Sequence, residues 1–448
     1  MSPPPSYCVL IAKVKTHDLK QLCEVSKYFH RIFMPMLYTT IIIQPANELY
    51  LSDVDVAPFL DTGIKRQPYV NDVQLRSTFH SNLERRCIHM SDSEGGAELH
   101  AFGTKLLNVF INRIRDQSLR SIRFVAILWH TIRRLLPNSW EMGTCVPLQV
   151  LEYLRSKQSA IETVALITAG DCHEAHSNGS IDLGRFRSLR DISWTGLQDI
   201  NDFNALSDAL EMNAGHLARL HVDFVNRTQD EWDGDNSASL FAELILKLPA
   251  GHCEVMFPSL QTLSLGSISL RGAEEKLVHA LNLWKLSSLT LRRCLGSEDL
   301  LEAIVDTNQT IEMSSLEISC EVSDDQYSIN SALVVFLAGA KGLKDLFVAL
   351  PAKDNMTLEF WNAVAANLPQ LARFVYHERG PYVGEEDWED GEDGASQYDY
   401  EIDFHNLSLS PEDIAVLDQA KSQHPFFRLQ LECLGLSCQP CLLVCMHS

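Results

Sequence analysis

The feature that most constrains the fold of this chain is an apolar hexad, Leu-x-x-Leu-x-Leu, that returns about every 26 to 30 residues. Clear copies are Leu260/Leu263/Leu265, Leu286/Leu289/Leu291, Met313/Leu316/Ile318 and Leu343/Leu346/Val348. A repeat of this length builds a solenoid, in which each unit contributes one short strand and stacks on the next unit. Because solenoids present long binding surfaces, the pattern favours a binding protein over an enzyme.

The first apolar anchor of the hexad can be followed through most of the chain. The anchors are Ile161, Leu189, Leu217, Leu260, Leu286, Met313, Leu343, Leu371 and Phe426, with a weak unit at Asp399 that keeps Ile402 and Phe404, and fainter units at Val70 and Leu119. The spacing is 43 residues between Leu217 and Leu260, where a polar stretch, 226–236, is expected to loop out. The remaining spacing is regular and predicts a register of about ten strands.

The segments between the hexads have helical periodicity, with apolar residues at i, i+3, i+4 and i+7. These segments are 238–248, 273–284, 297–306, 329–340, 357–368 and 411–421, with Ser297 and Ser410 as expected caps. Alternating strands and helices predict an α/β solenoid with parallel strands on the concave face and helices outside. The pattern resembles leucine-rich-repeat proteins of the longer, helix-containing type, whose Asn or Cys at the strand exit is matched at Cys294 and Cys320.

The segment 1–38 has a different pattern. Its apolar residues and one serine fall on a single helical stripe: Leu19, Leu22, Val25, Ser26, Phe29 and Phe33. Asp18 is placed to cap this helix, and the helix is expected to end before Pro35, because the residue before a proline disfavours helical geometry. Residues 39–43 are then expected to form the first strand.

This N-terminal segment resembles the second half of an F-box, particularly the fungal form that precedes leucine-rich repeats. The matching residues are Asp18, Leu19, Leu22, Val25, Ser26, Lys27, Phe29, Pro35, Leu37 and Tyr38. The family's opening Leu-Pro and first amphipathic helix are absent. The resemblance implies docking on the Skp-type adaptor of a cullin ubiquitin ligase through Leu19, Leu22, Val25, Ser26, Phe29, Pro35 and Leu37. The same side chains could instead pack on the first repeat as a solenoid cap.

A partner surface is expected where strand residues alternate with the buried anchors, since successive side chains on a strand point to opposite faces. This rule selects Arg219, His221, Asp223, Thr290, Arg292, Glu317, Asp345, Phe347, Arg373 and His377. Charged side chains with an aromatic among them suit recognition of another protein.

The formal net charge of -22 argues against nucleic acid as a partner, and no apolar run is long enough for a membrane span. The strongest charge block lies in 384–403, where nine carboxylates between Glu385 and Glu401 meet no Lys or Arg. It is expected to form a surface loop, either solvating or attracting a basic partner. Twelve scattered cysteines and the absence of a secretory signal favour the cytoplasm or nucleus.

No nucleotide-binding, hydrolase or zinc-protease motif is present, so no catalytic residue, metal or cofactor is assigned. The metal-type residues at 171–176 run into Ser-Asn-Gly-Ser and are expected to form a loop. The pair Cys438 and Cys441 lacks a second half-site for zinc. The expected organisation is an F-box-like segment at 1–38, a solenoid at 39–432 and a Cys-rich tail at 433–448. The expected function is non-catalytic substrate recognition for an SCF-type ubiquitin ligase; the alternative is a leucine-rich-repeat scaffold that binds a protein partner without ligase docking.

Overall fold

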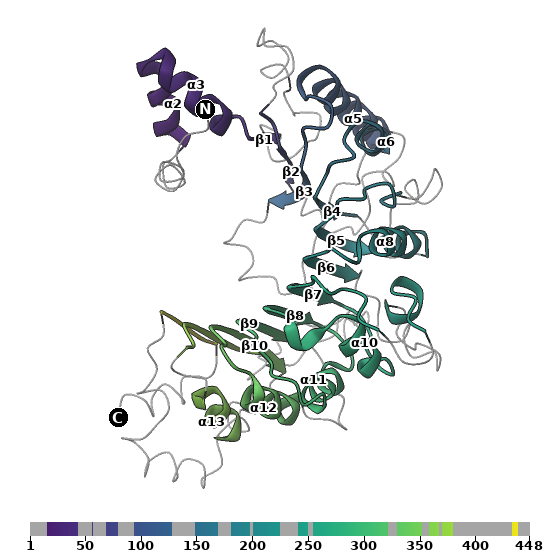
Figure 1. Ribbon diagram of the computed structural model, residues 1–448, viewed down its shortest axis with the longest axis vertical. Helices are drawn as coiled ribbons and strands as arrows, with labels where there is room; N and C mark the ends of the chain where they lie inside the picture. The colour runs from purple at the N-terminus through teal and green to yellow at the C-terminus, as the bar shows by residue number, and fades with distance from the viewer. Residues whose placement is uncertain are drawn as a thin grey trace, which may run out of the picture. The chain divides into compact units, whose positions relative to one another are not determined.

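The computed structural model describes residues 16–43, 56, 69–78, 94–127, 148–168, 181–197, 200–224, 241–249, 254–320, 329–351, 358–366, 370–379 and 432–437. The chain divides into two compact units, Met1–Leu217 and Ala218–Ser448. Figure 1 shows the helices and strands of both units.

Unit 1 contains a sheet whose neighbouring strands are parallel and follow chain order. The strands are β1 (Thr40–Ile43), β2 (Asp72–Thr78), β3 (Ser121–Ile127), β4 (Thr163–Ile167) and β5 (Asp191–Leu197). The helices are α2 (Thr16–Val25), α3 (Lys27–Leu37), α5 (Glu94–Arg113), α6 (Leu148–Lys157) and α8 (Ile200–Asn213).

Unit 2 repeats the arrangement, again with parallel neighbours in chain order. Its strands are β6 (Arg219–Phe224), β7 (Thr262–Gly266), β8 (Ser288–Arg292), β9 (Ser315–Ser319), β10 (Asp345–Pro351), β11 (Arg373–Arg379) and β12 (Cys433–Ser437). Its helical segments are η4 (Phe241–Ile245), α10 (Glu274–Ala280), η5 (Leu283–Lys285), α11 (Ser297–Asp306), α12 (Ile329–Gly339) and α13 (Leu358–Ala366). The helices α10 to α13 lie along one side of the strands (Figure 1).

The hexad forms the core of each unit. In the copy at Leu260, Leu263 and Leu265 the side chains are 3%, 0% and 1% exposed, and the anchors of the other described units are equally buried. The register places Leu263 opposite Leu289, so equivalent anchors stack from strand to strand. Each fully buried leucine contributes roughly 1.5 to 3 kcal/mol relative to exposure. The predicted α/β arrangement of parallel strands and helices is confirmed.

Two of the expected helices differ from the prediction. In the described part of the first, 241–248, the helical residues are the five of the π-helical turn η4. The segment 273–284 divides into α10 and η5 around Asn282, whose φ is +54°. The helix at 297–306 has the predicted bounds, but Ser297 does not cap it. Gly296, with φ +77°, holds the N-cap position, and the Ser297 hydroxyl donates to the Cys294 carbonyl at 2.8 Å. Glycine reaches this left-handed geometry at little steric cost.

The N-terminal helix was predicted wrongly in two respects. It is broken at Ser26, whose hydroxyl accepts a hydrogen bond from the Phe29 N–H at 3.1 Å and so begins a new helix, α3. Asp18 lies in the first turn of α2. Pro35 does not end α3 but lies inside it, and the Tyr38 N–H still bonds to the Met34 carbonyl at 3.1 Å. Pro35 cannot donate the bond to the carbonyl four residues earlier, but only two residues of α3 follow it.

The sheet of unit 2 extends beyond its predicted end. Strand β12 pairs in parallel with β11, with Arg373 opposite Cys433, so residues 433–437 of the expected Cys-rich tail belong to the sheet. Other predictions lie outside the described residues: the stretches 226–236 and 384–403, the unit at Asp399, the anchor Phe426, the segment 411–421 with its cap Ser410, the residues 171–176 and Cys438 onward.

Candidate partner-binding surface

The ten residues predicted for partner binding all lie on strands of unit 2, at positions that alternate with the buried anchors. The strand register arranges these positions in three rows, and we call the face that they occupy the open face. The first row is Arg219, Thr262, Ser288, Ser315, Asp345 and Arg373. The second row is His221, Ser264, Thr290, Glu317, Phe347 and Val375. The third row is Asp223, Gly266, Arg292, Ser319, Ala349 and His377.

Side chains of the first two rows are at least partly exposed at every position. Arg219 and Arg373 are the most open, and Thr290, Glu317 and Phe347 are half-buried. The prediction from the sequence left out four hydroxyl residues that the same alternation rule selects: Thr262, Ser264, Ser288 and Ser315. The centre of the open face is therefore rich in hydroxyl groups, with arginines at both ends.

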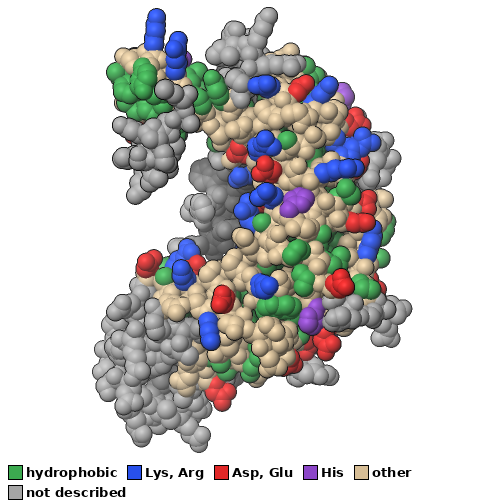
Figure 2. Space-filling model, in the orientation of Figure 1, with side chains coloured by type: hydrophobic (Ala, Val, Ile, Leu, Met, Phe, Trp, Pro, Cys, Tyr) green, Lys and Arg blue, Asp and Glu red, His purple; other side chains and the backbone are tan. Residues whose placement is uncertain are grey.

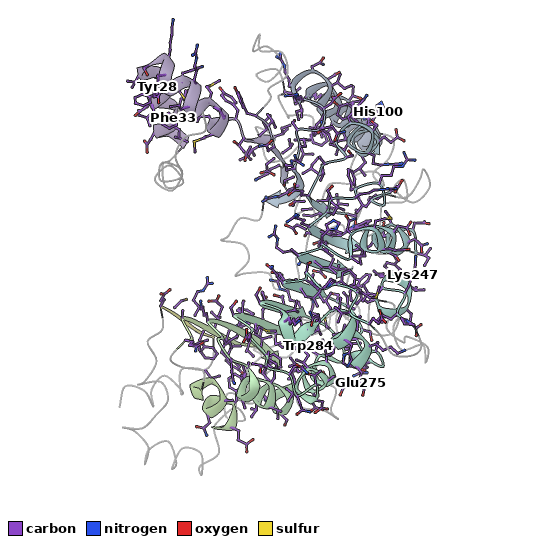
Figure 3. All side chains as sticks on the ribbon, in the orientation of Figure 1. Tyr28, Phe33, His100, Lys247, Glu275 and Trp284 are labelled. Atoms are coloured by element: carbon purple, nitrogen blue, oxygen red, sulfur yellow. The ribbon has the colours of Figure 1, made fainter. Side chains whose placement is uncertain are left out.

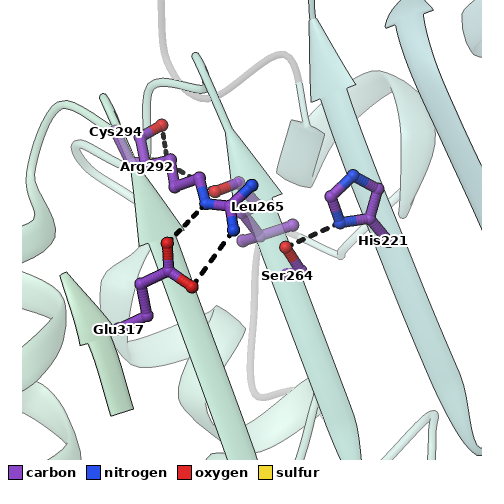
Figure 4. A network of polar contacts seen from close by, with 6 residues as sticks. All are labelled: His221, Ser264, Leu265, Arg292, Cys294 and Glu317. Carbon is purple, nitrogen blue, oxygen red and sulfur yellow. Dashed lines mark hydrogen bonds and ion pairs between the residues drawn. The ribbon is translucent and has the colours of Figure 1, made fainter. Parts of the chain in front are cut away.

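On the open face, side-chain contacts join β6 to β7 and β8 to β9 (Figure 4). The His221 Nδ1 lies 2.7 Å from the Ser264 hydroxyl, its register partner on β7. Arg292 donates to both carboxylate oxygens of Glu317, from Nε at 2.7 Å and from Nη2 at 3.1 Å. Their side chains are only 29% and 25% exposed, so water screens this bidentate pair incompletely.

A second bidentate pair lies farther along the first row. Arg373 donates to Asp345 from Nε at 2.5 Å and from Nη2 at 2.8 Å. The Arg373 side chain is 63% exposed, so its solvation is close to that of a surface group. Both pairs hold arginine side chains in fixed orientations, which reduces the entropy lost when a partner binds.

The prediction that Asp223 contacts a partner was wrong, because its side chain is buried. Only 3% of it is exposed, and Gly266 lies opposite it in the register. A Cβ built on Gly266 would overlap the Asp223 carboxylate, so the absent side chain provides the space in which Asp223 lies. Burial raises the pKa of the Asp223 carboxyl, and the charges of Arg293 and Arg292 oppose that shift. Simple alternation fails at this row, where Gly266, Ser319 and Ala349 are buried as well.

The residues predicted to bind an adaptor lie on α2 and α3, which pack against each other. Leu19 is 7% exposed and faces the interior, whereas Leu22, Ser26, Phe29, Pro35 and Leu37 are partly exposed. Phe29 stacks on Phe33 with ring centroids 5.7 Å apart. Among the described elements, neither helix packs extensively on β1 or a later element, as a solenoid cap would.

The most exposed apolar side chains of this pair are Val25 and Tyr28, each 70% exposed. Figure 3 labels Tyr28 and the buried Phe33 on α3. Val25 was predicted as an adaptor contact, and Tyr28 was missed because it lies off the apolar stripe of a single continuous helix. The break at Ser26 changes the rotation of α3 relative to that stripe, and so changes which residues are presented together.

Within the described ranges, no group of three or more His, Cys, Asp or Glu side chains is placed to hold a metal ion. None of the described helices is both long and apolar enough to cross a membrane. No protein-family model matches the chain, and a search of curated proteins found no match.

Proposed function

We propose that the chain is a leucine-rich-repeat protein of the helix-containing type and serves as the substrate-recognition subunit of an SCF-type cullin ubiquitin ligase. In this proposal the protein is non-catalytic and works in the cytoplasm or nucleus. The observation that carries the proposal is the pairing of a small helical module that exposes Val25 and Tyr28 with a repeat sheet that exposes a polar face. Each part has the surface that one of the two binding events requires.

The open face is proposed to hold the substrate protein. Arginine and aromatic side chains contribute disproportionately to binding energy at protein interfaces, and Arg219, Arg373 and Phe347 supply them. The hydroxyl groups between them can donate and accept hydrogen bonds, which suits a peptide backbone or polar side chains. Arg292 and Glu317 already satisfy each other, so they shape the surface more than they attract a charge.

The α2–α3 pair is proposed to dock on a Skp-type adaptor. Leu19 and Phe33 hold the two helices together and are too buried to reach another protein. The adaptor contacts would come from Val25 and Tyr28, with the partly exposed Phe29 beside Tyr28 and the partly exposed Leu37 at the end of α3. Exposed apolar side chains of this kind gain free energy when a partner covers them.

The test is co-purification with a co-expressed Skp-type adaptor, comparing the native chain with Val25→Asp/Tyr28→Asp. Both side chains are open to solvent, so the substitutions should leave the helix pair folded while placing charges in the interface. The control is Lys20→Asp/Arg31→Asp, which adds the same groups at exposed positions of the same helices. We expect adaptor binding by the native chain and the control but not by the Val25/Tyr28 variant.

A native chain that fails to bind the adaptor would overturn ligase docking, and so would a complex indifferent to the Val25 and Tyr28 substitutions. The open face belongs to unit 2 and does not depend on α2–α3. A chain that binds a protein partner through the open face but not the adaptor would therefore be a scaffold without ligase docking.

A further inference from the structure

Unit 1 carries a concentration of positive charge in the turns that precede β3, β4 and β5. These turns, 115–120, 155–162 and 181–190, contain seven Lys or Arg residues and three carboxylates, a formal charge of +4 in a chain of formal charge -22. The five turns before β7 to β11 in unit 2 (254–261, 281–287, 307–314, 340–344 and 370–372) contain three Lys and two Glu, a formal charge of +1. Figure 2 shows Lys and Arg side chains gathered over this part of unit 1.

Backbone hydrogen bonds place the three turns side by side. The Glu162 N–H donates to the Arg120 carbonyl at 2.7 Å, and the Arg190 N–H donates to the Glu162 carbonyl at 2.7 Å. The Gln117 N–H donates to the Lys157 carbonyl at 2.9 Å. We call the resulting surface the basic edge; its exposed cations are Arg115, Arg120, Lys157, Arg185, Arg187 and Arg190.

Carboxylates within the basic edge neutralise only part of this charge. Glu162 lies 3.5 Å from Arg120, and Asp182 lies 2.8 Å from Arg155 and 3.7 Å from Arg185. Within the part of the chain that the structure describes, the side chains of Arg115, Lys157, Arg187 and Arg190 make no ion pair or hydrogen bond. Unpaired cations held close together repel one another, and an anion placed between them would relieve that repulsion.

A favourable interaction with a helix dipole accounts for only two of the seven Lys and Arg residues of the three turns. Arg155 and Lys157 lie in the last turn of α6, where a positive charge is favoured by the helix dipole. Arg115, Arg187 and Arg190 lie outside the helices, on turns whose backbone is fixed by the buried side chains of Gln158 and Asn213. Their turns are therefore rigid platforms, and binding there would order little backbone.

We infer that the basic edge of unit 1 is a docking site for an acidic segment of a partner protein, distinct from the open face of unit 2 and from the α2–α3 pair. An extended peptide with several carboxylates would lie along the three turns and pair with Arg115, Arg187 and Arg190. The only aromatic residue of these turns, Phe186, is 1% exposed and leaves no surface on which nucleic-acid bases could stack. The large apolar residues of these turns are buried too, so the edge has no large apolar side chain to insert into a lipid surface; they are Leu119, Ile161, Ile181, Leu183 and Leu189.

The test measures binding of a fluorescein-labelled peptide of alternating Glu and Ser to the full chain by fluorescence anisotropy at low salt. The variant is Arg115→Glu/Arg187→Glu/Arg190→Glu, and the matched control is Lys285→Glu/Lys341→Glu/Lys344→Glu, which reverses three exposed charges on the turns of unit 2. We expect the unit 1 variant to lose about tenfold or more in affinity and the control less than about twofold. Circular dichroism checks that both variants remain folded.

Three outcomes would overturn the inference: no binding of the peptide by the native chain, equal losses in both variants, or tighter binding of a single-stranded oligonucleotide or of phosphatidylserine vesicles than of the peptide. The experiment uses no adaptor and alters neither the open face nor α2–α3. Its failure would thus leave the proposed ligase function standing, and loss of adaptor binding would leave the basic edge standing.

Discussion

The side chain of Asn213 holds the backbone of Leu189, the first anchor of its hexad, from the end of the following helix. The Asn213 Oδ1 accepts a hydrogen bond from the Leu189 N–H at 2.9 Å. Its amide nitrogen donates to the carbonyls of Phe186 at 2.8 Å and Ala209 at 2.7 Å. Asn213 has no exposed surface, so these bonds satisfy backbone groups that water does not reach.

Gln158 performs the same task at an earlier repeat. Its Oε1 accepts from the Leu119 N–H at 3.1 Å, and its Nε2 donates to the Arg115 carbonyl at 3.0 Å. Gln158 follows α6 as Asn213 ends α8, and both side chains are fully buried. A carboxamide suits this position because it offers a donor and an acceptor in one neutral group.

Replacing Asn213 with leucine should destabilise the fold by about 3 kcal/mol, because it leaves the buried Leu189 N–H and Phe186 carbonyl without partners. Asn204→Leu on the exposed side of α8 is the control and should change stability by less than about 0.5 kcal/mol. Urea denaturation followed by circular dichroism measures both. Equal effects would mean that the carboxamide bonds at Asn213 contribute little.

The strands were predictable because their signal is repeated and local. Anchors such as Leu263 and Leu289 recur at a fixed spacing, and the register places them opposite each other. Asn213 and Gln158 could not be found in this way, because one buried carboxamide at a helix end has no period. Its role depends on a backbone N–H from another turn, and the sequence alone does not show that proximity.

The residues of the open face were predictable where alternation along a strand decides exposure. The prediction was wrong for Asp223, because the burial of that residue depends on Gly266 on the neighbouring strand, 43 residues later in the chain. The predicted helix end before Pro35 was wrong for a related reason: Phe33, two residues earlier, is buried, and packing of this kind is not visible in the local sequence.

Gly266→Ala should destabilise unit 2 by about 2 kcal/mol, because the new methyl group would overlap the Asp223 carboxylate. The same substitution in an Asp223→Ala background should have an effect close to zero, since the carboxylate is then gone. Thermal and urea denaturation of the two single variants and the double variant give the coupling. An effect of Gly266→Ala that is independent of residue 223 would contradict this packing.

Asp223 should make stability depend on pH. Because the folded pKa is raised above the usual value of 3.8, its contribution to stability is fully present below that value and is lost as pH rises through the folded pKa. Asp223→Asn removes this titration. We therefore expect the free energy of unfolding of Asp223→Asn to increase relative to that of the native chain as the pH rises above 3.8.

The measurement for Asp223 is urea denaturation of both proteins at several pH values, with the exposed Asp208→Asn as control. The control should follow the native curve closely. A difference between native and Asp223→Asn protein that does not change with pH would show that the raised pKa has no effect on folding.

The two arginine pairs of the open face should differ in strength. A double-mutant cycle with Arg292→Met and Glu317→Gln should give a coupling of about 1 to 2 kcal/mol that persists in high salt, because both side chains are largely shielded from water. The equivalent cycle on Arg373 and Asp345 should give a smaller coupling that salt abolishes, since Arg373 is open to solvent. The reverse order would mean that shielding from solvent does not govern the strength of these pairs.

Cys294 should be chemically inert in the folded protein. Burial raises the pKa of its thiol to about 12, and its Sγ lies 3.4 Å from the Leu265 carbonyl, to which it donates. At pH 8 only about one thiol in 10⁴ would then be ionised, and alkylating reagents attack the thiolate. Cys433, which begins β12, is exposed. Iodoacetamide followed by mass spectrometry of peptides should find Cys433 modified and Cys294 unmodified in the native protein, and both modified after unfolding in urea. Modification of native Cys294 at the rate of Cys433 would show that the segment after β8 opens to solvent.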